Sequence, residues 1–193
     1  MGSTLFEALV ERAAEHQGIV TTNDARSLGI DPTQLRILAH RGKLERIGRG
    51  VYRVIALPLG RFLPYAEAVA WAPEGSSISH ESALAIRELG DFNPTRIDVT
   101  VPRGYRPRRK VPRTLRLRQP DLDQGDIDMV DGVPTAAVLR AILQVIEAGS
   151  DPYQVRRAIS DAYRQGHIGG REAERMRRTL TRSKHRAGSD VSV

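Results

Sequence analysis

Two predicted helices with almost nothing between them constrain the fold of this chain more than any other feature. The first is expected over residues 23–28. The second is expected over residues 32–41, with Asp31 as its N-cap and Pro32 at its first position. Only Gly29-Ile30 separates the first helix from the cap of the second. This spacing predicts a helix-turn-helix, in which a short turn that often contains glycine joins two helices.

Elements on both sides of this pair complete the pattern of a winged helix. A helix is expected over residues 4–16, followed by a short extended piece at Ile19–Thr21. After the pair, residues 44–47 and 51–54 alternate between apolar and polar side chains as strands do. Gly48-Arg49-Gly50 between them favours a tight turn. Helix, strand, helix, helix and hairpin, in this order, predict a winged helix-turn-helix.

DNA binding is the function that this module predicts, because the second helix of such a motif enters the major groove. From residue 26 to residue 53 there are seven Lys/Arg and two acidic residues, a net charge of +5. Gln34 and Arg36 carry donors and acceptors that match base edges, and the glycines beside Arg49 allow close approach to a groove. A solvated helix face remains the alternative for each arginine taken alone. The predicted DNA contacts are Thr33, Gln34, Arg36, His40, Arg41, Lys43, Arg46, Arg49 and Arg53.

A second region follows Pro58 and Gly60, so the class expected for the whole chain is α+β. The predicted domains are a winged helix at 1–57, a mixed α/β domain with a small sheet at 61–182, and a flexible tail at 183–193. The second domain is expected to contain strands at 97–101, 115–118 and 127–130, and helices at 61–72, 79–89, 135–148, 152–164 and 170–182.

Two further basic stretches lie in this second region. Residues 103–118 hold eight Lys/Arg and no acidic residue, and prolines within them prevent a helix, so a long loop between strands is expected. Auxiliary contact with nucleic acid or with a partner is predicted for Arg106, Arg108, Arg109 and Lys110, with a solvated loop as the alternative. In the stretch 171–186, Arg175, Arg178 and Arg182 share one helix face, and both auxiliary contact and a solvated tail remain open for it.

Composition narrows the partner and the compartment. The 193 residues carry a formal net charge of +7, which favours an anionic partner such as nucleic acid. There is no cysteine, which excludes a disulfide framework and a zinc finger. No apolar run approaches the length of a transmembrane helix, and the first residues lack the pattern of a signal peptide. We therefore expect a cytoplasmic protein without a membrane partner.

The search for enzyme chemistry in the sequence yields no catalytic residue, metal ligand or cofactor motif. His80-Glu81 begins like a zinc motif, but Leu84 occupies the position of the second histidine. The aspartates between 121 and 131 are spaced for neither an EF-hand nor a paired-carboxylate site, and no Glu-x-Lys or Asp-x-Lys occurs. The chain is therefore predicted not to be an enzyme. A metal-dependent nuclease guided by the winged helix remains an alternative, motivated by these aspartates.

Two passages resemble the AbiEi family, the antitoxins of AbiE-type (type IV) toxin–antitoxin systems. The first comprises Gly18–Ile30 and Gly42–Arg53, which is similar to the winged-helix motif of the family. The second comprises Ile78–Leu84, Asn93-Pro94 and Ile97–Pro102, which is similar to the start of its C-terminal domain. At 137–139 the chain reads Ala-Val-Leu where the family often has an Arg-Thr pair before Leu.

The resemblance implies a protein with two functions. Its winged helix would bind inverted repeats in double-stranded operator DNA of its own promoter and repress transcription. Its C-terminal domain would counter a nucleotidyltransferase-like toxin, directly or indirectly. By position, the family's DNA contacts fall on Arg36, Arg41, Lys43, Arg49 and Arg53. A winged-helix transcription factor outside any toxin–antitoxin operon is the alternative.

Overall fold

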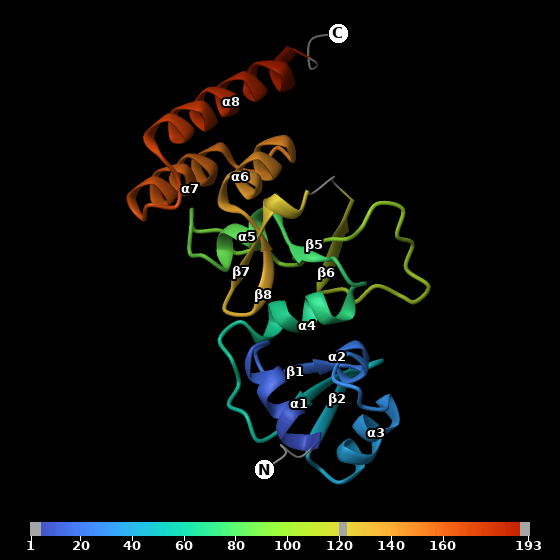
Figure 1. Ribbon diagram of the computed structural model, residues 1–193. Helices are drawn as coiled ribbons and strands as arrows, with labels where there is room; N and C mark the ends of the chain where they lie inside the picture. Colours follow the sequence, from blue (N-terminus) through green and yellow to red (C-terminus); the bar gives the residue numbers. More distant parts are fainter. Residues whose placement is uncertain (1–4, 120–122, 190–193) are drawn as a thin grey trace. The chain divides into compact units, whose positions relative to one another are not determined.

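The computed structural model describes residues 5–119 and 123–189, which form two compact units (Figure 1). One unit comprises Met1–Ser76 with Met129–Pro134, and the other Ser77–Asp128 with Thr135–Val193. Helices and small sheets occur in both, so the α+β class is confirmed. The predictions made for Asp121 and for residues 190–193 of the tail lie outside the described residues.

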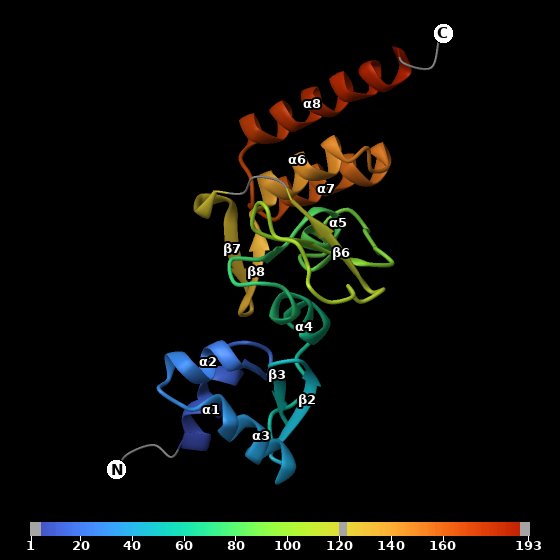
Figure 2. The same ribbon diagram turned by 90° about the vertical axis from the view of Figure 1, so that its right-hand side faces the viewer.

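The first unit has the predicted order of a winged helix. The elements are α1 (Leu5–Ala14), β1 (Ile19–Thr21), α2 (Thr22–Ser27), α3 (Pro32–His40), β2 (Leu44–Gly48), β3 (Val51–Val54) and α4 (Leu63–Trp71). The three strands form an antiparallel sheet in the order β1-β3-β2. Figure 2 shows α3 beside this sheet. Helix α3 is one residue shorter than expected, and β2 is one residue longer.

A single apolar core holds α1, α2 and α3 on one face of this sheet. Leu9 from α1, Leu35 from α3 and Val54 from β3 are completely buried in it, together with Val20 from β1. Full burial of an aliphatic side chain of this size contributes roughly 1.5–3 kcal/mol. The core therefore fixes α3, the helix expected to meet DNA, on a rigid support.

Helix α4 belongs to the first unit, although the sequence placed residues 61–72 in the second domain. It contacts β1 and β3. The Phe62 amide, just before the helix, donates to Oε1 of Gln17 over 3.2 Å. The first boundary between the units consequently falls after Ser76, later than the joint expected near Pro58, and Met129–Pro134 is grouped with the first unit as well.

The second unit contains a mixed sheet and helices. Its elements are β4 (Ser77–Ile78), α5 (His80–Ala85), β5 (Ile97–Thr100), β6 (Leu115–Arg118), the short helix η1 (Gln124–Asp126), β7 (Ile127–Val130), β8 (Val133–Ala136), α6 (Val138–Glu147), α7 (Pro152–Arg164) and α8 (Gly170–Ser189). The strand order is β6-β5-β4-β8-β7. β5 runs antiparallel to β4 and parallel to β6.

Several elements of this unit differ from the sequence prediction. The helix expected over 135–148 begins only at Val138, because Val133–Ala136 is strand β8. Strand β4 was not predicted, and the helix expected over 79–89 ends at Ala85. Helix α8 continues to Ser189, seven residues into the expected tail. Ala173, Met176 and Leu180 recur at helical spacing, and their burial anchors α8 against α6 and α7.

Candidate nucleic-acid interface

The first helix of the helix-turn-helix pair begins with a capping box. The Asp24 amide donates to Oγ1 of Thr21 over 3.1 Å, and the Thr21 amide donates to Oδ2 of Asp24 over 2.8 Å. The N-cap is therefore Thr21, which has an acid three residues later. Burial alone would raise the pKa of Asp24, but the Thr21 bonds and the Arg12 ion pair outweigh it and lower that pKa.

The start of α3 confirms the capping predicted from Asp31-Pro32. The Asp31 carboxylate accepts a hydrogen bond from the Thr33 amide over 2.7 Å, and Pro32 occupies the first turn, where no amide donor is needed. The hydrogen bond from Thr33 lowers the pKa of Asp31, so its carboxylate stays charged at neutral pH. The cap at Asp31 and the fixed φ of Pro32 thus determine the direction in which α3 begins.

The outward face of α3 carries most of the predicted contacts. Leu35 and Leu38 face the core. Thr33, Arg36 and His40 are exposed on the other side, and Gln34 is half-buried. Among the residues that the structure describes, Arg36, His40 and the following Arg41 make no hydrogen bond or ion pair through their side chains. These side chains are therefore available to base edges and phosphates. Ile37 is 37% exposed between them and offers an apolar contact.

The tight turn of the wing is attached to the start of α2. The Thr22 amide donates to the Gly50 carbonyl over 2.9 Å. Gly50 has a φ of +75°, and a Cβ there would stand 2.9 Å from Oγ1 of Thr22. Only glycine fits this position without a shift. Arg49 beside it is exposed at the tip of the hairpin, and within the described ranges its side chain has no partner.

Two other predicted contacts are exposed but already touch protein groups. Arg46 donates from Nε to the Gly48 carbonyl over 3.2 Å, where the register of β2 against β3 shifts. The Lys43 ammonium lies 4.6 Å from the ring centroid of Phe6. Both contacts are at the surface, so each side chain can exchange its partner for a phosphate at low cost.

Arg53 is not brought together with the α3 residues. Its neighbours in β3, Tyr52 and Val54, are buried in the core that α3 shares, so Arg53 points to the opposite face of the sheet. Its Nε donates to Oε2 of Glu45 over 2.9 Å, directly across the hairpin. Glu67 of α4 is close enough for Arg53 to act on its pKa, which burial raises and Arg53 lowers. The Arg53 side chain therefore lies near Glu45 of β2 and Glu67 of α4, on the face of the sheet away from α3.

The basic loop of the second unit is the predicted connection between two strands, β5 and β6. Gln119 holds it at one point by donating to the Tyr105 carbonyl over 2.7 Å. Of the four candidates for auxiliary contact, Arg106, Arg108 and Lys110 are exposed and Arg109 is half-buried.

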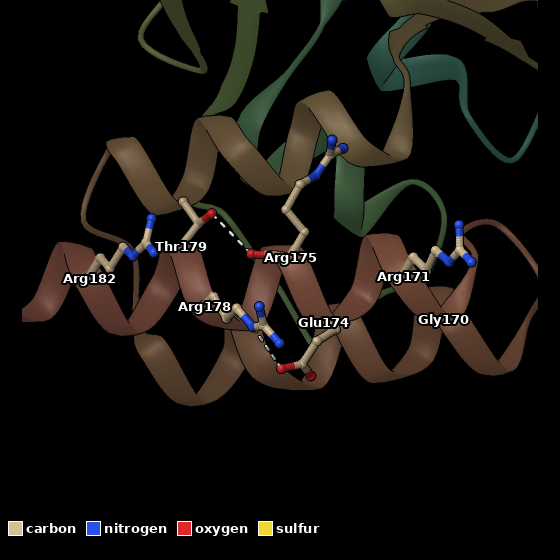
Figure 3. Close-up of a pocket in the computed structure, with 7 residues that line it drawn as sticks. All are labelled: Gly170, Arg171, Glu174, Arg175, Arg178, Thr179 and Arg182. Carbon is tan, nitrogen blue, oxygen red and sulfur yellow. Dashed lines mark hydrogen bonds and ion pairs between the residues drawn. The ribbon is translucent and has the colours of Figure 1, made fainter.

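A second basic surface lies on α8 (Figure 3). Arginines at helical spacing, with Glu174 and Thr179, line a groove along the helix. In Figure 3, Arg171, Arg175 and Arg182 point to one side of α8, whereas Arg178 turns toward Glu174, to which it donates over 3.1 Å. The groove is defined by Gly170, Arg171, Glu174, Arg175, Arg178, Thr179 and Arg182.

Two of the acidic residues that motivated the nuclease alternative, Asp126 and Asp128, are engaged with arginines. Asp128 accepts from Nη2 of Arg87 over 3.2 Å, and Asp126 lies 3.9 Å from Nε of Arg140. Within 5–119 and 123–189, no three His, Cys, Asp or Glu residues are grouped closely enough to hold a metal ion. In the same ranges, no helix is long and apolar enough to cross a bilayer.

Comparisons with known proteins bear on the first unit. Residues 7–55 match the family model described as "Transcriptional regulator, AbiEi antitoxin". No curated protein matches the chain. The crystal structure of the RV2827C protein from Mycobacterium tuberculosis matches at 17% identity with a TM-score of 0.43, covering 91% of this chain and 72% of that one. The resemblance to AbiEi antitoxins is thus confirmed over residues 7–55.

Proposed function

We propose that this chain is a DNA-binding transcriptional repressor whose first unit docks on double-stranded operator DNA through α3 and the wing. The observation that carries the proposal is a set of exposed cations without side-chain partners among the described residues, in and after α3 and at the tip of the wing: Arg36, Arg41 and Arg49. Arginine forms paired hydrogen bonds to guanine edges and to phosphates, and α3 presents Arg36 from a rigid core. Phosphates on the partner would neutralise these charges and give binding a steep dependence on salt.

The test is a binding titration with the DNA that precedes the gene, at fixed salt. Arg36→Ala and Arg49→Ala are expected to weaken binding, each by about 1–3 kcal/mol if the arginine reads a base. Arg96→Ala, an exposed arginine of the second unit, is the matched control and should leave affinity unchanged. Unchanged affinity for both winged-helix variants, alone and combined, would remove this contact map.

The finer role that we infer is autoregulation within a toxin–antitoxin operon in the cytoplasm. The match of residues 7–55 to the family model described as "Transcriptional regulator, AbiEi antitoxin" supports this role. The proposal predicts inverted repeats in the operator, and a neighbouring gene for a nucleotidyltransferase-like toxin that the second unit counters without enzymatic activity. A reporter under the upstream DNA tests repression, and co-expression with the neighbouring gene tests neutralisation.

The basic loop and the α8 groove supply the proposed auxiliary contacts. Arg171, Arg175 and Arg182 carry no ion pair within the described residues, so a polyanion would meet charges that are not yet neutralised. Replacing Arg106, Arg108 and Lys110 by alanine is expected to reduce the slope of log affinity against log salt by about one per lost phosphate contact. An unchanged slope would show that these three loop residues make no phosphate contact.

A further inference from the structure

Helix α8 carries a row of exposed arginines along one side (Figure 3). Its members lie three or four residues apart, so at about 100° per residue they fall within about 60° of the helix circumference. From the first member to the last, the row is about 16 Å long at about 1.5 Å per residue. The α8 row consists of Arg171, Arg175, Arg178 and Arg182.

The backbone that carries this row is held in place from the other side of the helix. Ala173, Met176 and Leu180 point the opposite way and are buried. Helix α8 contacts both α6 and α7. The arginines therefore project from a fixed helix, and a ligand of the row needs to order only their side chains.

Both acidic residues of α8 are already engaged. The Gly169 amide donates to Oε2 of Glu172 over 2.7 Å at the start of the helix. Glu174 accepts from Nε of Arg178 over 3.1 Å, and its other carboxylate oxygen lies 4.0 Å from Nη1 of Arg177. Neither carboxylate is left to neutralise the rest of the row.

The unpaired α8 arginines are the other three members of the row, Arg171, Arg175 and Arg182. They are exposed, and within the described residues their side chains make no hydrogen bond or ion pair. In Figure 3 all three point to the same side of α8. They concentrate positive charge along that side, which favours an anionic ligand.

The lining of the groove on α8 narrows the choice of anion. Its side chains are those of arginine, glutamate and threonine, and none is aromatic or purely aliphatic. A protein partner would find no apolar anchor there, and exposed ion pairs contribute only about 0–1 kcal/mol each. A single strand would find no aromatic ring on which to stack its bases. The groove therefore fits the backbone of a duplex, which cations alone can hold because counterions are released.

We propose that the unpaired α8 arginines bind the phosphate backbone of double-stranded DNA without reading its sequence. The choice of DNA rests on the proposed function, in which the same chain docks on a DNA duplex through α3. One strand presents a phosphate for each about 3.4 Å of the duplex axis, so the row faces about five phosphates. Contacts to phosphates carry no sequence information, so α8 adds affinity while α3 and the wing supply specificity.

The test is a titration of the full-length chain with a DNA duplex of unrelated sequence at several salt concentrations. Combined Arg171→Gln, Arg175→Gln and Arg182→Gln replacement should reduce the slope of log affinity against log salt by about 0.9 for each lost phosphate contact. Affinity for the upstream DNA should fall by the same factor, because these contacts do not depend on sequence. Glutamine retains nearly the helix propensity of arginine, so α8 should stay folded, which circular dichroism checks.

A second triple variant separates a site on α8 from the effect of net charge. Arg96→Gln, Arg156→Gln and Arg157→Gln remove the same charge from exposed positions of the second unit outside α8. This control should keep the slope of the native chain. Equal losses for the two triple variants would overturn the proposal, since net charge alone would then explain both.

The remaining outcomes distinguish this site from the operator site and from other ligands. An unchanged slope in the α8 variant would overturn the α8 proposal and leave operator binding by α3 standing. Equal affinity of the native chain for upstream and unrelated DNA would remove operator recognition and leave the α8 proposal standing. The α8 variant should lose more affinity for the DNA duplex than for an RNA duplex, a single strand or poly-glutamate. A larger loss for any of these three would overturn the proposal.

Discussion

Thr22 and Gly50 join the helix-turn-helix to the wing, through the Thr22 amide and the Gly50 carbonyl 2.9 Å apart. Gly50→Ala should destabilise the fold by about 1–2 kcal/mol for its left-handed backbone, plus at least about 1 kcal/mol for the crowding against Thr22. Gly42→Ala is the matched control, because its φ is +69° and nothing lies within 4 Å of the added Cβ. Urea unfolding measures both. Equal losses for the two variants would show that the Thr22 contact adds nothing.

Asp24 gives the first unit a stability term that depends on pH. Its pKa is lowered in the folded state, so the stabilisation is complete above the ordinary value of 3.8 and disappears as the pH falls through the lower folded value. Asp24→Asn should therefore be less stable than the native chain at pH 7, and the difference should shrink below about pH 4. Unfolding followed between pH 7 and 2.5 tests this, with the exposed Glu11→Gln as control. A difference that is constant with pH would contradict it.

Arg53 should contribute less to DNA affinity than its position in the family motif implies. It is paired with Glu45 on the face of the sheet turned to α4. We expect Arg53→Ala to change operator affinity less than about twofold, against the loss of at least about fivefold expected for Arg36→Ala. Equal losses in the same titration would place Arg53 at the DNA.

His80 should make the second unit less stable in mild acid. Burial, with the charges of Arg118, Arg116 and Arg140, lowers its pKa from 6.5 to about 4. Between these values the unfolded chain binds a proton that the folded chain does not, so stability falls as the pH drops from about 6.5 to about 4. His80→Asn, which tolerates the φ of +53°, should flatten this slope, and the exposed His167→Asn should leave it unchanged. If His80→Asn left the dependence of stability on pH unaltered, His80 would not be neutral in the folded chain over this pH range.

The sequence predicted the winged helix best because its signals are local. The cap at Asp31, the proline after it and the glycines around Arg49 each determine backbone geometry within a few residues. The pairing of Arg53 was also readable, since Glu45 and Arg53 alternate with core residues on facing strands. Its charge and its position in the AbiEi-like motif nevertheless predicted a DNA contact for Arg53.

The second unit was harder to predict because its decisive contacts are distant in sequence. Thr135 and Ala136 continue an apolar run and were assigned to a helix, but they pair in the sheet beside β4. Asp131-Gly132, both with positive φ, is a hairpin signal that announces this strand. The apolar residues of α4 predict that one side of this helix is buried, but they do not indicate which neighbour covers it. The packing of α4 against β1 and β3 could therefore not be predicted from the sequence.

Since α4 covers the outer side of the three-stranded sheet, a truncated protein that keeps the winged helix should keep α4 as well. A polypeptide stopped at residue 57 would bare the Glu45–Arg53 side of the sheet and lose the support that α4 gives to β1 and β3. One extended through Ser76 keeps that cover. Truncations meant to separate operator binding from the rest of the chain should therefore be cut after α4.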